Sequence, residues 1–286
     1  MKNILLPTDF SENSWNAIKY AIQFFRNTSC NFYLLYVNKL SNMVADDSYY
    51  IPTTNVIEDT YIKPAKVQLR RVLKRISKEF PENDSHKFYT MTDYDFFIDS
   101  IRRHIVENKI DVIVMGTKGA SGLEKLIIGT NTGDVITKVK CTTIIVPENA
   151  QFKELKEIAF PTDFSLRYGI ETLNPLSNLI DNFGSSLRIV HIGKKHEALN
   201  ENQKKNKELL EDYFGHQKHS FHFLTSKKVE ESIQCFVESR DINMIAMVAK
   251  NLNYFQQLLF HSRVEEISYH TDIPFLVLHE QHFNHI

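Results

Sequence analysis

Short apolar runs recur along the chain, and each is followed by a segment in which apolar residues return at helical spacing. In the first half the runs predict strands at Ile4–Pro7, Asn31–Val37, Lys87–Met91, Ile110–Met115 and Thr142–Val146. In the second half they predict strands near 157–160, 187–192, 219–224, 242–248 and 274–278. Because strands alternate with helices, the pattern predicts an α/β fold of doubly wound, five-stranded parallel sheets with right-handed crossovers.

The segments between the strands also predict local structure. Ser11 stands where a helix N-cap would, ahead of apolar residues at helical spacing. Residues 38–57 predict a long surface loop, and residues 193–205 a polar, lysine-rich connection. Pro175 predicts that the first helix of the second half starts late or is kinked.

The chain contains an internal repeat. Pro-Thr-Asp-Phe-Ser occurs at 7–11 and again at 161–165. The strand at 110–119 aligns with 242–251, and 141–148 aligns with 273–280. The sequence therefore predicts two copies of one fold, with domains at 1–150 and 151–286.

Composition excludes several classes of function. The formal net charge is −1, so no strong field would attract nucleic acid or an anionic membrane. No apolar run is long enough to cross a bilayer, and the N-terminus has no pattern of a cleavable signal. The cysteines Cys30, Cys141 and Cys235 fit no CxxC pattern, which favours a reducing cytosol. We therefore expect a cytoplasmic protein that binds neither nucleic acid nor membrane.

A glycine cluster follows the buried strand at 110–115. Five of the 9 glycines of the chain lie at positions 116, 119, 122, 129 and 133. Glycine lets the backbone approach a ligand closely, and the next helix would offer free N–H groups to a phosphate. Thr130 could cap that helix or bond a phosphate oxygen, Asn131 could add a donor, and Lys118 could add charge. The alternative is a tight strand-to-helix turn without a ligand.

The spacing is Gly116, two residues, Gly119, nine residues, Gly129 and Thr130. This differs from GxxxxGK[ST] and from GxGxxG. It resembles the G-x2-G-x9-G-[ST] pattern of the ATP-binding branch of the universal stress protein family. The flanking strands and the Pro-Thr-Asp-Phe-Ser opening resemble that family too, in a tandem form over nearly the full length.

The resemblance implies further contacts with ATP, with Mg or Mn as the accompanying ion. Asp9 matches the aspartate that approaches the nucleoside, and Thr8 lies beside it. Val37 matches the residue whose backbone recognises adenine, and Met115 would help to line the pocket. For Asp9 the alternative is a cap or turn residue, and for Val37 it is core packing.

The second copy departs from this pattern. Val248, Asn251 and His261 replace the three motif glycines, although Asp163 and Ser262 remain. Bulky side chains should close the approach to phosphate, which predicts one nucleotide per chain. The resemblance also implies that Thr142–Pro147 and Pro274–Leu278 pair within the chain as a pseudo-dimer, with a homodimer of chains as an extension.

Three functions fit these observations. The first is an ATP-binding regulatory protein that responds through conformation or through an unknown protein partner. The second is a slow ATPase or nucleotidyl-transferring enzyme, although no catalytic base is evident beside the loop. The third is an interaction module without nucleotide.

Histidines and tyrosines offer weaker signals. Histidine recurs every third residue at 216–222 and at 279–285, which is compatible with a metal site, but solvated loop and chain end are the favoured interpretation. Tyr49, Tyr50 and Tyr61 could form a lid, a partner surface or loop packing.

Overall fold

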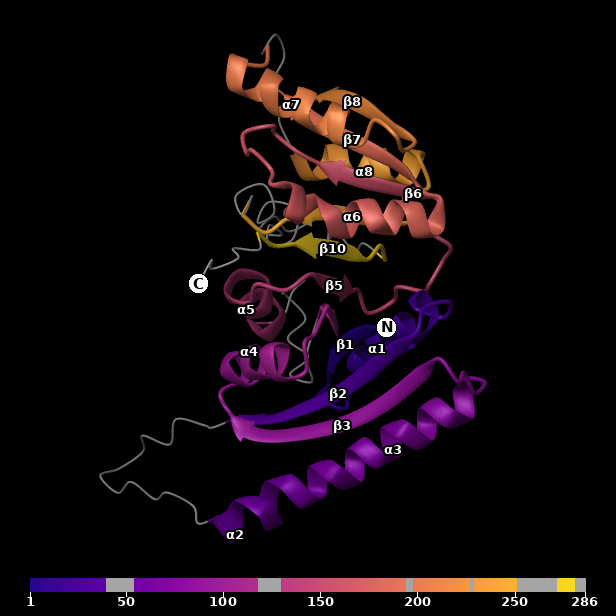
Figure 1. Ribbon diagram of the computed structural model, residues 1–286, viewed down its shortest axis with the longest axis vertical. Helices are drawn as coiled ribbons and strands as arrows, with labels where there is room; N and C mark the ends of the chain where they lie inside the picture. The colour runs from indigo at the N-terminus through magenta and orange to yellow at the C-terminus, as the bar shows by residue number, and fades with distance from the viewer. Residues whose placement is uncertain (40–53, 118–129, 194–197, 227–228, 251–271, 281–286) are drawn as a thin grey trace, which may run out of the picture. The chain divides into compact units, whose positions relative to one another are not determined.

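The computed structural model describes residues 1–39, 54–117, 130–193, 198–226, 229–250 and 272–280. Its described residues fall into two compact units, the first ending at residue 141 and the second beginning at residue 142. Each unit is a sheet with helices packed against it (Figure 1).

The first unit alternates strands and helices. Its elements are β1 (Lys2–Pro7), α1 (Glu12–Phe24), β2 (Cys30–Lys39), α2 (Thr54–Ile57), the π-helix η1 (Glu58–Ile62), α3 (Lys63–Glu79), β3 (His86–Asp95), α4 (Phe97–Glu107), β4 (Val112–Gly116) and α5 (Thr130–Lys138). The strand order is β3-β2-β1-β4, and the three pairings β1–β2, β1–β4 and β2–β3 are all parallel. Figure 1 shows α3 running alongside β3 and α4 next to α5.

The second unit begins with the last strand of the first half. Its elements are β5 (Thr143–Val146), β6 (Glu157–Pro161), α6 (Ile170–Phe183), β7 (Ser186–Gly193), α7 (Glu201–Tyr213), β8 (His219–Thr225), α8 (Val229–Ser239), β9 (Met244–Val248) and β10 (Phe275–Leu278). The order is β5-β10-β9-β6-β7-β8, with β10 antiparallel to β5 and the other strands parallel. The predicted pairing of the two fifth strands is thus confirmed.

The backbone itself repeats between the halves. Among the described residues of the first half, two that are not glycine have positive φ, Phe10 at 65° and Lys109 at 48°. Their counterparts in the sequence repeat, Phe164 and Asp241, have φ of 57° and 49°. A positive φ costs a side chain of this kind about 1–2 kcal/mol, so its recurrence reflects a requirement of the shared fold. The left-handed turn after β1 and after β6 belongs to that framework.

The predicted α/β class and every predicted strand are confirmed, but the bounds of two connections and of the third strand were predicted wrongly. The loop predicted at 38–57 is wrong at both ends, because β2 extends to Lys39 through its pairing with Asp95 and a helix begins at Thr54. Residues 40–53 lie outside the described residues. The connection at 193–205 contains the start of α7, where Asn200 and Gln203 form a capping box. The third strand continues past Met91 to Asp95, beside β2. As predicted, α6 starts late, at Ile170.

The N-cap prediction for Ser11 is confirmed. Its Oγ accepts a hydrogen bond from the Ser14 N–H at 3.2 Å and donates to Asp9 Oδ1 at 2.6 Å. Replacing Ser11 by alanine should lower the free energy of unfolding by about 1 kcal/mol, because a donor of the first helical turn loses its acceptor. Urea denaturation followed by circular dichroism measures this loss.

Ser165→Ala is the matched control for that prediction. Ser165 Oγ makes the same bond to Asp163 Oδ1, at 2.8 Å, but α6 begins five residues later and Ser165 caps no helix. Its loss should therefore be smaller. Equal losses in the two variants would contradict the assigned capping contribution.

Candidate functional site

The carboxyl ends of β1 and β4 form the centre of the candidate site. These strands are parallel neighbours, with Ile4 opposite Val112 and Leu5 opposite Ile113. The chain proceeds to β2 on one side and to β4 on the other, so the strand order reverses between β1 and β4. In open α/β sheets such a reversal leaves a crevice outside the carboxyl ends, where ligands bind.

The loop after β1 is fixed by its own side chains. The buried Thr8 hydroxyl accepts a hydrogen bond from the Phe10 N–H at 3.1 Å and lies 3.0 Å from the Ser14 hydroxyl. Asp9 Oδ1 accepts bonds from the N–H and the hydroxyl of Ser11, at 3.1 and 2.6 Å. These hydrogen bonds give the backbone N–H groups of Phe10 and Ser11 acceptors, and so stabilise the turn in which Phe10 is left-handed. Asp9 itself is half-buried at the mouth of this turn.

Gly116 closes the other side of the crevice. A Cβ at this position would lie 3.0 Å from Asn13 Oδ1 and 3.1 Å from Asn13 Cγ, closer than side chains normally allow. The Gly116 carbonyl accepts a hydrogen bond from Thr132 Oγ1 at 2.8 Å. Gly116 therefore links the end of β4 to the first turn of α1 on one side and to the start of α5 on the other.

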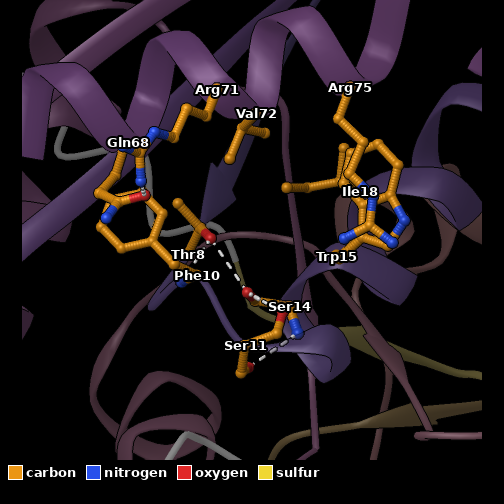
Figure 2. Close-up of a pocket in the computed structure, with 10 residues that line it drawn as sticks. All are labelled: Thr8, Phe10, Ser11, Ser14, Trp15, Ile18, Gln68, Arg71, Val72 and Arg75. Carbon is orange, nitrogen blue, oxygen red and sulfur yellow. Dashed lines mark hydrogen bonds between the residues drawn. The ribbon is translucent and has the colours of Figure 1, made fainter. Parts of the chain in front are cut away.

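A small cavity adjoins this loop between α1 and α3 (Figure 2). Its volume is about 140 Å³, and its wall includes Thr8, Phe10, Ser14 and Trp15. Sites for whole small molecules usually measure about 300–1,000 Å³. By itself, this cavity is too small to hold a nucleotide. It could accommodate only part of a ligand bound in the adjoining crevice.

An ion-pair network holds α3 over α1 beside this cavity. Arg75 contacts both carboxylate oxygens of Glu12, at 2.6 and 3.0 Å, and donates to Glu79 at 2.9 Å. Its guanidinium also lies 4.2 Å from the Trp15 ring centroid, in cation–π geometry. The hydrogen bond from Arg75 lowers the pKa of Glu12 below its usual value. Both side chains are solvent-exposed, so the network mainly fixes the orientation of the two helices.

The sequence-predicted residues divide into two groups. Thr8, Asp9, Met115 and Gly116 lie at the ends of β1 and β4, and Val37 lies near the end of the neighbouring strand β2. Thr130 and Asn131 are the first residues of α5, whose start is bonded to Gly116. The remaining three, Lys118, Gly119 and Gly129, lie outside the described residues.

Three contributors were not found from the sequence: Asn13, Ser14 and Thr132. Asn13 lies under Gly116, Ser14 pairs with Thr8, and Thr132 bonds the Gly116 carbonyl. The only available signal was their position in the first turns of the two helices that follow β1 and β4. Their partners are remote in the sequence or depend on the turn geometry, so the pattern alone could not assign these contacts.

In the second unit the corresponding loop is covered by its own neighbours. Thr162 bonds the buried Tyr168 hydroxyl at 2.9 Å, and burial raises the pKa of Tyr168 to about 12. From α7, Gln203 Nε2 donates to the Asp163 carbonyl and Asn206 Nδ2 donates to the Phe164 carbonyl, both at 2.8 Å. The residue at the end of the neighbouring strand also differs between the units. Strand β9 ends at the buried Val248, whereas β4 ends at Gly116.

Three of the described histidines were assigned wrongly to a solvated loop or chain end. His219 and His222 lie on β8, and Ser220 Oγ contacts His222 Nε2 at 2.8 Å. His279, at the end of β10, is half-buried, and burial lowers its pKa to about 4. Among the described residues, no group of His, Cys, Asp and Glu could hold a metal ion. His282, His285, Tyr49 and Tyr50 lie outside those residues, while Tyr61 stacks on Tyr94 with ring centroids 4.8 Å apart.

Comparisons with known proteins agree with this fold. The Universal stress protein family matches residues 1–147. Universal stress protein MJ0531 of Methanocaldococcus jannaschii is 28% identical over 148 residues, which are 51% of this chain and 81% of that protein. The chain therefore belongs to the universal stress protein family.

Two solved structures resemble nearly the whole chain. A universal stress protein from Archaeoglobus fulgidus matches with a TM-score of 0.69 and 17% identity, over 96% of this chain and 97% of its own. A functionally unknown protein, PA1789 of Pseudomonas aeruginosa, matches with a TM-score of 0.60 and 12% identity, over 98% and 92%. At these identities the likeness establishes the fold. In the described part of the chain, no helix is both long and apolar enough to span a membrane.

Proposed function

We propose that this protein is a tandem universal stress protein whose first half, residues 1–150, binds one ATP, with Mg or Mn. The nucleotide would occupy the crevice at the carboxyl ends of β1, β2 and β4. The second half, residues 151–286, would be a structural partner without nucleotide. The protein would act in the cytoplasm as a regulator, through a ligand-dependent change of conformation or of partner affinity.

The observation that carries this proposal is the contrast between Gly116 and Val248. A Cβ at Gly116 would lie only 3.0 Å from Asn13 Oδ1, and the Gly116 carbonyl is bonded to Thr132 at the start of α5. Helix N-termini favour phosphate through free N–H groups and the helix dipole. The second unit completes the same strand order with valine at the equivalent position. The strand order itself therefore does not require glycine there. In the first unit the glycine makes room for Asn13, and we infer that it also leaves room for a ligand.

The residues around the crevice fit the chemistry of a nucleotide. Thr130 and Asn131 stand in the first turn of α5, where they can donate to phosphate oxygens. Asp9 offers a carboxylate for a sugar hydroxyl or for the accompanying cation, which would neutralise phosphate charge. The half-buried Val37 lies on the neighbouring strand β2, and we propose that its backbone contacts the base.

Replacing Asp9 by asparagine should weaken ATP binding about tenfold, because a charged acceptor is lost while the Oδ1 contacts to Ser11 can be kept. Asp163→Asn is the matched control. Asp163 Oδ1 makes the same two contacts, to the N–H and hydroxyl of Ser165 at 2.9 and 2.8 Å. Calorimetric titration with Mg–ATP should give one site per chain. Asp9→Asn should lower the ATP affinity, and Asp163→Asn should leave it unchanged.

Other results would redirect the proposal. Two ATP molecules per chain, or equal effects of the two substitutions, would contradict a site confined to the first half. Failure of the wild-type protein to bind ATP with either Mg or Mn would favour an interaction module. Linear production of ADP or AMP by the folded protein would instead favour the slow enzyme.

A further inference from the structure

A larger cavity lies at the opposite edge of the first sheet, where β3 begins. Its volume is about 550 Å³, within the range of small-molecule sites. Helix α1, helix α3 and strand β3 line it, and its apolar wall consists of Ile22, Leu73, Ile76, Phe80 and Phe88. Thr8 and Gly116 stand at the carboxyl ends of parallel strands, so this cavity is separate from the nucleotide crevice.

The rim of this cavity carries negative charge. Glu82 and Asp84, both exposed, belong to its lining, whereas no described lysine or arginine does. His86 also lines it, and its Nε2 is bonded to the Phe25 carbonyl at 3.1 Å. The cavity therefore combines an apolar, partly aromatic wall with two carboxylates at its edge. Such a lining complements a ligand that has an apolar body and a cationic group.

The corresponding turn of the second unit is packed differently. Phe80 directly follows α3 and Phe214 directly follows α7. Their N–H groups bond Ile76 O at 2.9 Å and Leu210 O at 3.0 Å. Phe80 is half-buried, whereas Phe214 is fully buried at 0% exposure. The next turn places Gln217, 9% exposed, against α6, where its Nε2 donates to the carbonyl and hydroxyl of Ser177 and to Asp181.

This contrast indicates that the open cavity is not a requirement of the fold. The same helix–turn–strand unit is completed with a buried phenylalanine and a bonded glutamine in one copy. In the other copy Pro81, Glu82 and Asp84 line an open space. The apolar side chains of this cavity face a space of about 550 Å³ that an apolar body can contact.

We propose that this cavity binds a small organic cation, an amine with an aromatic or branched aliphatic body. The body would pack against Phe80, Phe88 and Ile76, and the ammonium group would lie near Glu82 and Asp84. The volume favours a small molecule over a protein segment, and the charge favours an amine over a carboxylic acid. This site does not depend on the nucleotide site proposed above.

Calorimetry on the full chain tests this proposal with a charge-matched pair of probes. 1-Naphthylmethylamine should bind with one site per chain, and 1-naphthoate should bind at least about tenfold more weakly. Ser77 lines the cavity on an exposed face of α3. Ser77→Trp should therefore obstruct the mouth and abolish amine binding, while Ser77→Ala should preserve it. The circular dichroism spectra of both variants should match the wild type.

A second pair of variants tests the charges. Glu82→Gln combined with Asp84→Asn should weaken amine binding about three- to tenfold, the range expected for exposed charge pairs. Asp212→Asn removes an exposed carboxylate from the corresponding part of the second unit and should have no effect. ATP affinity should be unchanged in all these variants.

Three results would overturn the proposal: no binding of the amine, equal affinity for naphthoate, or amine binding that persists in Ser77→Trp. Tighter binding of a tryptophan–lysine peptide than of the free amine would assign the cavity to a protein partner instead. Because ATP titration is run on the same samples, failure here is distinguishable from failure of the proposed ATP site.

Discussion

Gly116→Val is expected to weaken ATP binding at least about a hundredfold, to the limit of calorimetric detection. The substitution places in the first unit the residue that ends β9 in the second. Its Cβ would meet Asn13 Oδ1 at 3.0 Å, and its methyl groups would occupy the crevice beside the start of α5. Both effects act where the phosphate is proposed to lie.

Two further variants keep this test decisive. Gly116→Ala adds only the Cβ, so it should reduce the ATP affinity less than Gly116→Val does. The reduction measures how much of the effect comes from the close contact between the Cβ and Asn13. Val248→Gly should not create a second site, because Gln203 and Asn206 still cover the loop after β6. Unchanged ATP affinity in a folded Gly116→Val protein would contradict a ligand at the end of β4.

Phe32→Ala is expected to be the most destabilising change considered, with a loss of about 3–5 kcal/mol in the free energy of unfolding. Phe32 is 0% exposed in the middle of β2. Its ring centroid lies 5.0 Å from His86, 5.1 Å from Phe88 and 6.4 Å from Phe25. Domains are commonly stable by about 5–15 kcal/mol, so the loss is a large part of the total.

The adjacent residue provides the control for that prediction. Tyr33 points to the other face of the sheet, is half-buried and stacks on Tyr89 with centroids 5.0 Å apart. Tyr33→Ala should cost about 1 kcal/mol, as for a cross-strand aromatic pair. Trp15, the only tryptophan of the chain, lies in the first unit and reports its urea unfolding by fluorescence. Equal losses in both variants would contradict the assigned core.

The fold class was predictable because its signal is local. A buried parallel strand is apolar on both faces, so runs such as Ile110–Met115 stand out without any knowledge of their neighbours. The N-cap at Ser11 was predictable for the same reason, since its contacts lie within three residues. The repeat at 7–11 and 161–165 correctly indicated that both halves share one strand order.

Boundaries that depend on partners were not predictable to the same degree. Strand β3 continues to polar Asp95 because β2 pairs with it along the whole length. Asp93 is held there by Ser100 Oγ at 2.5 Å and by His104 Nε2 at 2.8 Å, both from α4. The start of α7 did carry a local signal, the Asn200–Gln203 capping box, which the lysine-rich composition of the segment obscured.

The sequence by itself determined the α/β class, the repeat and the glycines of the proposed nucleotide loop. Only the tertiary structure decided that Asn13 lies beneath Gly116, that α7 covers the second loop, and that a cavity remains open beside Phe80. The physical reason is the range of the interactions. Secondary structure follows from the order of neighbouring side chains, whereas sites and cavities are set by which distant side chains the fold packs together.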